Sequence, residues 1–178
     1  TGSALTINSG NGAAVISGGT SDLVTLTVNS NSASSRVLDA IAGATNLVKL
    51  GTGTLTLTGT NTYTGITTIT SGTLALSGSG SIGTSSGVSN AATFDISATT
   101  SGATITTLSG AGSVVLGTKT LTLSAANDTF AGVISGTGGL VLSSGTQTLT
   151  GNNTYTGGTT INGGTLSFGA NDVLSNTG

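Results

Sequence analysis

The chain has 178 residues and a formal net charge of −2, and only 4% of its residues are charged. The low charge argues against a disordered chain, because disorder usually combines high charge with few aliphatic residues. The absence of proline excludes collagen. Three scattered cations, Arg36, Lys49 and Lys119, cannot neutralise a run of phosphates, so we expect no nucleic-acid partner. No apolar run is long enough to span a bilayer, so we expect no membrane insertion by this segment.

Short strands separated by Gly, Asn and Ser turns are predicted along the whole chain. Most alternate an apolar residue with Thr or Ser, as in Leu55-Thr56-Leu57, which is the period of a strand with one buried face. Only Val37–Ala44 has helical features, and there we expect one irregular turn. In chain order the predicted strands are Ala4–Ile7, Leu23–Val28, Val37–Ile41, Leu47–Leu50, Thr54–Thr58, Thr67–Thr70, Thr73–Leu76, Thr93–Ile96, Thr104–Leu108, Val114–Leu116, Thr120–Leu123, Leu140–Leu142, Thr148–Thr150, Thr159–Ile161 and Thr165–Phe168.

One stretch of 22 residues occurs twice, at Gly53–Leu74 and, 92 residues later, at Gly145–Leu166. The copies share 17 of the 22 positions, including the rare residues Tyr63 and Tyr155. Self-similarity of this kind indicates a repeat architecture. A weaker third copy begins at Thr120–Leu123 and places Phe130 where the first copy has Tyr63.

The repeat decides between an antiparallel sandwich and a stacked solenoid. Each copy reads strand, turn, strand, turn, strand, which matches one coil of a right-handed, single-stranded parallel β-helix. We therefore predict an all-β fold, a β-solenoid that forms one domain over residues 1–178. Dividing the spacing of 92 into four gives coils of about 23 residues, and about seven to eight coils in all.

Solenoids normally cap their two ends, because an end coil exposes unpaired strand edges. Neither end of this chain has a polar capping sequence. We therefore expect a piece or processed form of a longer repetitive protein, or a subunit whose ends are covered by neighbours. Other copies of the chain, stacked end to end, are one such neighbour.

The repeated motif T-L-T-L-T-G-x-N-T-Y-T-G-x-T-T-I-x-x-G-T-L resembles the passenger-associated transport repeat of bacterial autotransporters. It spans Thr54–Leu74 and again Thr146–Leu166, where Gln147 replaces the first Leu. The segment Thr129–Leu140 is similar to the phrase F-x-G-x-I-x-G-x-G-x-L that often precedes this repeat. The resemblance implies a β-helical stalk that is exported to the bacterial outer surface through a C-terminal β-barrel.

Catalytic and metal-binding chemistry has little support in the sequence. Histidine is absent, and the Ser and Thr hydroxyls have no activating base apart from Lys49 and Lys119, so we expect no enzyme. Calcium-binding glycine–aspartate motifs are absent too, so we expect no metal and no cofactor. Stacked coils could still bring carboxylates together from Asp22, Asp39, Asp95, Asp128 and Asp172, as in β-helical polysaccharide-degrading enzymes.

Tyr63 and Tyr155 are the candidate functional aromatics, because both occupy the same repeat position after an Asn turn. One interpretation is a stripe of exposed rings that stack on sugars. The interpretation that we favour is that each ring packs over its turn and hydrogen-bonds through its hydroxyl. Lys49 lies between Val48 and Leu50, so we expect its side chain to point outward from a strand.

The function that the sequence favours is structural, a stalk or filament-forming segment of an extracellular, autotransporter-like adhesin. Its partners would be copies of itself or adjoining repeats, and surface glycans or a neighbouring cell. A filament would follow if uncapped coils join head to tail without closing. The alternatives are a carbohydrate-active β-helix enzyme, which requires converging Asp carboxylates, and a sugar-binding module, which requires exposed tyrosines.

Overall fold

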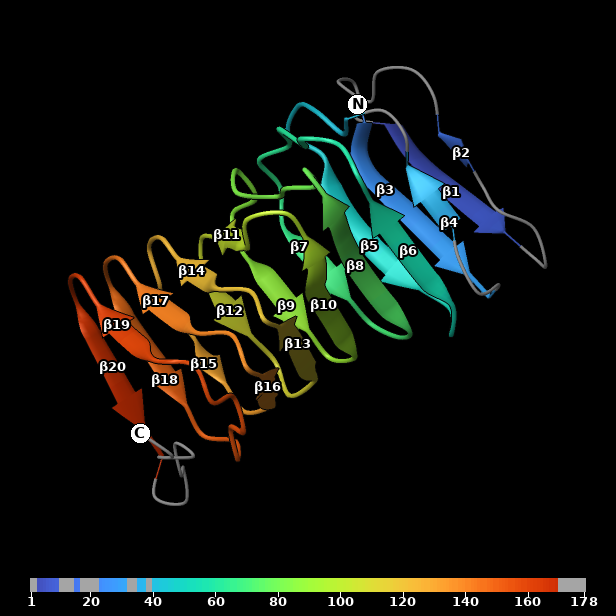
Figure 1. Cartoon of the computed structure of the whole chain (residues 1–178). Coiled ribbons are helices and arrows are strands. Elements are labelled where there is room, and N and C mark those ends of the chain that lie inside the picture. Colours follow the sequence, from blue (N-terminus) through green and yellow to red (C-terminus); the bar gives the residue numbers. More distant parts are fainter. Residues whose placement is uncertain (1–2, 10–14, 17–22, 32–34, 38–39, 170–178) are drawn as a thin grey trace.

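The computed structural model is all-β and describes residues 3–9, 15–16, 23–31, 35–37 and 40–169. No helix occurs in these ranges, and every strand pairing within them is parallel. Figure 1 shows the strands stacked side by side along one axis, from the blue N-terminal end to the red C-terminal end. Parallel pairing between successive coils excludes the antiparallel sandwich and confirms the predicted β-solenoid, with about seven turns.

The coil has three faces, which we number in chain order. Face 1 is a six-stranded sheet, which a bridge between Gly110 and Phe130 connects to a three-stranded sheet further along the axis. The strands of the first sheet are β1 (Ser3–Ser9), β3 (Leu23–Ser30), β5 (Asn46–Leu50), β7 (Thr67–Ile69), β9 (Val88–Asn90) and β12 (Leu108–Ser109). Those of the second sheet are β15 (Thr129–Phe130), β18 (Thr146–Leu149) and β20 (Thr165–Phe168).

Face 2 is a single seven-stranded sheet. Its strands are β2 (Val15–Ile16), β4 (Ser35–Val37), β6 (Thr54–Leu57), β8 (Thr73–Gly78), β10 (Thr93–Thr99), β13 (Ser113–Gly117) and β16 (Val133–Gly136). Beyond β16 the face continues as a loop, because the N–H of Thr154 donates to the carbonyl oxygen of Ile134 at 2.8 Å.

Face 3 changes from loops to strands along the axis. In the N-terminal half it consists of stacked loops, in which Thr62 N donates to Ile41 O at 2.8 Å and Thr60 forms a bridge with Ser81. In the C-terminal half it is a four-stranded sheet, seen at the upper edge of Figure 1. Its strands are β11 (Ala103–Ile105), β14 (Leu121–Leu123), β17 (Leu140–Leu142) and β19 (Thr159–Ile161).

One coil contains 18 to 21 residues, from Ala103 paired with Leu121 to Leu26 paired with Leu47, so the predicted coil of about 23 residues is wrong. Leu55 pairs with Leu74, and Leu74 with Phe94, on face 2. On face 3, Ala103 pairs with Leu121. The spacing of 92 residues between the two copies is therefore not four coils, but about four and two-thirds.

The fractional coil places the two copies of the repeat on different faces. In the first copy, β6 and β8 lie on face 2 and β7 lies on face 1. In the second copy, the equivalent strands β18 and β20 lie on face 1 and β19 lies on face 3. The repeat is thus a module about one coil long that is not tied to one side of the rod.

The core fills the space between the three faces. Alternate residues of each strand point inward, so β6 has half-buried threonines and fully buried Leu55 and Leu57. Successive coils place these side chains above one another, and burying each such leucine contributes about 1.5–3 kcal/mol relative to exposure. The inward residues of all three faces form one hydrophobic cluster.

Strand positions were largely predictable, but some elements were missed. The predicted strand Thr104–Leu108 spans a corner and belongs to β11 on face 3 and β12 on face 1. The predicted strand Val37–Ile41 overlaps β4 only at Val37, and residues 38–39 lie outside the described part. β2, β9, β15 and β16 were not predicted.

Candidate functional site

The repeat's asparagine joins three successive coils where face 3 has no strands. Asn61 Oδ1 accepts a hydrogen bond from Ile41 N, in the coil before, at 2.9 Å. Its amide nitrogen donates to Gly59 O at 2.9 Å and to Ser81 O, in the coil after, at 3.0 Å. A buried side chain therefore supplies pairing that a strand would otherwise make through its backbone.

The second copy repeats this arrangement on face 2. Asn153 Oδ1 accepts from Ile134 N at 2.9 Å, and its amide nitrogen donates to Gly151 O at 2.9 Å. The backbone N–H groups that follow also correspond, since Tyr63 donates to Ile41 O and Tyr155 to Ile134 O, both at 3.2 Å. The same sequence builds the same local structure on two different faces.

Tyr63 is fully buried, and its hydroxyl starts a chain of buried hydroxyl groups. The hydroxyl lies 2.6 Å from Thr67 Oγ1, which lies 2.9 Å from Ser85 Oγ in the next coil. Ser85 Oγ also lies within hydrogen-bonding distance of two backbone carbonyl oxygens, those of Gly65 and Gly87. Burial raises the pKa of Tyr63, and the hydrogen bonds to Thr67 and Ser85 oppose that shift only in part.

Tyr155 has the same setting, with 4% of its surface exposed and its hydroxyl 2.7 Å from Thr159 Oγ1. A ring that stacks on a sugar must present a face to solvent, and neither tyrosine does so. The two tyrosines also lie on different faces, so they form no stripe along the rod. Their burial and hydroxyl bonds fit the turn-packing interpretation.

In each copy of the repeat, a glycine forms the corner between the second and third strands. Gly72 and Gly164 are equivalent and have positive φ angles of 68° and 85°. A Cβ atom would collide with the carbonyl oxygen of Gly53 at the first position and with that of Gly145 at the second. Only glycine allows both the backbone angle and the close approach of the previous coil.

Lys49 points into the core, so the predicted outward orientation is wrong. On β5, Leu47 and Lys49 are buried while Val48 and Leu50 are half-buried on the outer side. The Lys49 ammonium donates to the carbonyl oxygens of Leu50, Gly51 and Ser71, at 2.6, 2.8 and 3.2 Å. It thus connects two coils at the corner between faces 1 and 2, and burial lowers its pKa.

Two other polar side chains act in the interior of face 1. Asn90, which follows Lys49 and Ile69 in one inward column, donates to Ser113 O at 2.8 Å at the same corner. Gln147 donates to Leu108 O at 2.9 Å and Asp128 O at 3.1 Å, across the junction of the two sheets of face 1. Gln147 Oε1 is buried and has no hydrogen-bond partner.

Among the described residues, the two aspartates lie on different parts of the coil. Asp95 lies on β10 of face 2 and accepts from Ser97 N at 2.8 Å. Asp128 precedes β15 of face 1 and accepts from the Thr107 hydroxyl at 2.9 Å. The other three candidates, Asp22, Asp39 and Asp172, lie outside the described residues.

The described residues contain no group of three acidic, His or Cys side chains that could hold a metal ion. Within the same ranges, no helix has the length and apolar character to cross a membrane.

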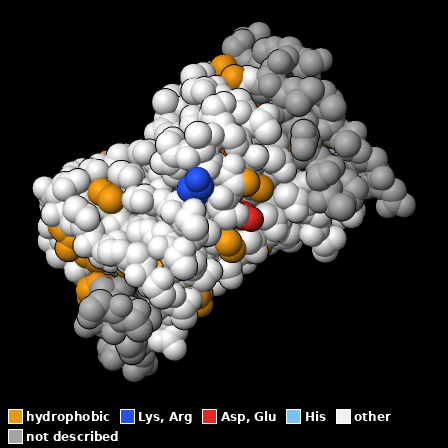
Figure 2. Space-filling model, viewed as in Figure 1, with side chains coloured by type: hydrophobic (Ala, Val, Ile, Leu, Met, Phe, Trp, Pro, Cys, Tyr) orange, Lys and Arg blue, Asp and Glu red, His pale blue; other side chains and the backbone are white. Residues whose placement is uncertain are grey.

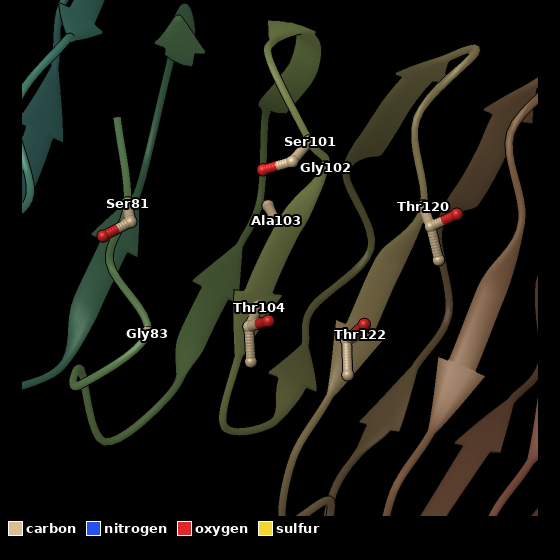
Figure 3. A pocket seen from close by; sticks show the side chains of 8 residues that line it. All are labelled: Ser81, Gly83, Ser101, Gly102, Ala103, Thr104, Thr120 and Thr122. Carbon is tan, nitrogen blue, oxygen red and sulfur yellow. The ribbon is translucent and has the colours of Figure 1, made fainter. Parts of the chain in front are cut away.

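The chain carries few charged residues and is rich in Ser and Thr. The face shown in Figure 2 is mostly white, with scattered orange areas and small blue and red ones. On face 3, where loops give way to strands, there is a hollow of about 310 Å³. Figure 3 shows its lining, which comes from the loop at Ser81–Gly83, the start of β11 and the neighbouring β14.

Two segments, residues 47–76 and 142–168, match a family model described as the passenger-associated-transport-repeat. The chain carries two passenger-associated transport repeats. The first transport repeat extends from β5 to β8 and includes Asn61, Tyr63 and Lys49, and the second extends from the end of β17 to β20. Searches of the curated proteins and of the solved structures each gave no significant match.

The transport repeats and the β-solenoid together fit an autotransporter passenger domain. The asparagines and tyrosines of the two repeats are buried, and each bonds to the coil before it. Sequence reasoning missed the inward positions of Lys49 and Gln147. Counting one coil back from Ile69 to Lys49 and then to Val28 would have placed Lys49 in an inward column.

Proposed function

We propose that this chain is a stalk segment of an autotransporter-like adhesin at the bacterial outer surface, which holds an adhesive region away from the cell. The observation that carries the proposal is the reuse of the transport repeat. Two copies make the same backbone bonds on different faces, to Ile41 in one case and to Ile134 in the other. Because both copies use the motif to bond to neighbouring coils, we infer that the motif stabilises the rod.

Rigidity follows from the continuous pairing between coils. Each coil bonds to the coils before and after it, so bending the rod would break strand ladders on one face while compressing those on another. Interior side chains such as Asn61 and Lys49 add bonds at the loops and corners where ladders are interrupted. The low charge of the surface leaves few groups that could attract nucleic acid or charged substrates.

Surface display is tested by fusing the epitope-tagged chain to an autotransporter translocator in a Gram-negative host. We expect antibody labelling and protease cleavage of the tag on intact cells. A matched fusion with both Asn61→Ala and Asn153→Ala should show reduced display, because folding of the stalk is weakened. Wild-type fusion that stays in the periplasm while the translocator inserts would contradict the proposal.

A carbohydrate-binding role is the second candidate, and the hollow on face 3 favours it. Its lining supplies the hydroxyl groups of Ser81, Ser101, Thr104, Thr120 and Thr122, with no charged side chain. Such a lining suits a neutral sugar, which offers hydroxyl donors and acceptors in return. NMR titration with neutral oligosaccharides tests this, and shifts should centre on Thr104 and Thr122 and be lost in Thr104→Val.

We also propose that the segment has no enzymatic activity. Asp95 and Asp128 lie on different faces, and each bonds to a group in its own surroundings. Incubation of the chain with polysaccharides of several classes should release no reducing ends. Release that is lost in Asp128→Asn would overturn this part of the proposal.

A further inference from the structure

The hollow on face 3 lies where the coil becomes shorter. Val88 and its partner Leu108 are 20 positions apart, whereas Thr104 and its partner Thr122 are only 18 positions apart. A shorter coil has a smaller outline, so the surface recedes where the stacked loops of face 3 give way to strands. The hollow is therefore a feature of the middle of the rod, with described coils on both sides of it.

Gly83 keeps one wall of the hollow open. A Cβ atom there would meet only Thr104, at 3.4 Å from its carbonyl oxygen, and the φ angle of Gly83 is not positive. Gly102, in the same lining, has a φ angle of 94°, and a Cβ atom there would collide with the carbonyl oxygen of Thr120. Backbone geometry thus explains the glycine at position 102 but not the one at position 83, where the missing side chain leaves free space.

The hydroxyl groups that line the hollow are free to bind a ligand. They belong to Ser81, Ser101, Thr104, Thr120 and Thr122 (Figure 3). Within the part of the chain that the structure describes, none of these hydroxyl groups has a hydrogen-bond partner. Two positions further along each coil the hydroxyl groups are engaged, since Thr106 donates to Ser85 O at 2.6 Å and Ser124 to Ile105 O at 3.3 Å. The lining therefore offers a ligand both donors and acceptors.

Lys119 lies at the rim of the hollow, directly before Thr120 in the chain. Its ammonium group donates to the carbonyl oxygen of Thr100 at 3.2 Å, beside the residue that leads into Ser101. This oxygen is its one partner among the described residues, and no carboxylate in those ranges pairs with it. An ammonium group has three donors, so two remain for an anionic group of a ligand.

We propose that this region binds a glycan that contains an acidic sugar. A neutral sugar unit occupies the hollow, and the carboxylate of the adjoining unit pairs with the Lys119 ammonium. The inference rests on the carbohydrate-binding candidate of the proposed function and specifies its class of glycan. Because the ion pair is exposed to solvent, it should tighten binding only about two- to fivefold, and added salt should weaken it.

Two matched pairs of disaccharides test the proposal, one with the glucose and one with the galactose configuration. In each pair the acidic member carries a carboxylate where the neutral member has a hydroxymethyl group. NMR titration of the wild-type chain at low salt should show tighter binding of an acidic member, with shifts at Thr104, Thr122 and Lys119. Molar salt should remove this preference while binding of the neutral member persists.

Three variants separate the hollow from its rim. Lys119→Gln should bind both members of a pair equally, and Lys119→Arg should keep the preference for the acidic member. Gly83→Leu should bind neither member, because its side chain fills the hollow, and it should keep the circular dichroism of the wild-type chain.

Equal binding of the neutral and acidic members by the wild-type chain would overturn the proposal and leave the carbohydrate-binding candidate in place. A preference for the acidic member that persists in Lys119→Gln would also overturn it. Absence of binding by all four disaccharides would overturn the proposal together with that candidate. Display of the stalk on cells is measured separately, so none of these results bears on it.

Discussion

The side-chain amide of Gln147 donates to the carbonyl oxygen of Leu108 at 2.9 Å, although 39 positions separate the two residues. The bond passes over the intervening coil at the junction where the six-stranded sheet of face 1 ends and the three-stranded sheet begins. In the first transport repeat the equivalent residue is Leu55, which lies within an unbroken sheet. The Gln that replaces Leu at this repeat position thus supplies hydrogen bonds where the sheet of face 1 is interrupted.

Gln147→Glu should destabilise the chain much more than Gln147→Leu at pH 7. A glutamate carboxylate would face the carbonyl oxygens of Leu108 and Asp128 without a proton to donate, at a cost of about 2–4 kcal/mol. Leucine removes the donors but also the unpartnered Oε1, and should cost about 1 kcal/mol.

Acidification should reduce the difference in stability between the two variants. Burial raises the folded-state pKa of the new carboxyl above its unfolded value of about 4.3, so Gln147→Glu regains stability as the pH falls toward that value. Urea unfolding at several pH values measures this. Equal stability of the two variants at pH 7 would contradict the assigned role of Gln147.

For Lys49 we expect the opposite dependence, in which the free energy of unfolding rises with pH in the alkaline range. Its folded-state pKa is lowered by burial, so between that value and the ordinary 10.5 the unfolded chain binds more protons than the folded chain. The free energy of unfolding of the wild type, relative to Lys49→Met, should therefore rise as the pH approaches 10.5. A difference that stays constant or falls over this range would show that the lysine is not buried.

Tyr63→Phe should cost about 1–2 kcal/mol, because Thr67 and Ser85 lose the hydroxyl that completes their buried chain. The unfolded tyrosine ionises near pH 10, while burial keeps the folded one neutral at higher pH, so wild-type stability falls above pH 10. Tyr63→Phe should lose less stability over the same range. Parallel alkaline losses in both chains would argue against a buried hydroxyl.

Asn61→Ala should destabilise the chain by about 2–3 kcal/mol, since the bonds to Ile41, Gly59 and Ser81 disappear together. Asn152→Ala is the matched control, because this exposed neighbour of Asn153 should cost less than about 0.5 kcal/mol. Chemical unfolding monitored by circular dichroism gives both values. Similar losses in the two variants would mean that the asparagine does not join coils.

The sequence was sufficient for the fold class, because the alternation of Leu with Thr predicted strands and the internal repeat favoured stacked coils over a sandwich. It was insufficient for the coil length. Repeat spacing defines the coil only if the copies lie on the same face, and Tyr63 and Tyr155 lie on different faces. Coil length had to come from the strand register, such as Leu55 with Leu74.

Side-chain orientation could not be predicted correctly where polar residues occupy inward columns. A lysine between two apolar residues, such as Lys49, indicates a side chain that points outward. Lys49 points inward instead, because hydrogen bonds to three carbonyl oxygens compensate for its burial. In the sequence, Gln147 stands out only as a departure from the repeat, because a break in a sheet two coils away has no local sequence pattern. The burial of Tyr63 and Tyr155 was the interpretation favoured by their position after an asparagine turn.

We conclude that the transport repeat is a one-coil module placed on different faces of one solenoid. Spin labels at Thr64 and Thr156, equivalent exposed positions in the two copies, test it most directly. Copies stacked in one column four coils apart would give a distance of about 20 Å, from a spacing of about 4.8 Å per coil. Because the copies lie on different faces, double electron–electron resonance should give a clearly longer distance, and a distance of about 20 Å or less would contradict this placement.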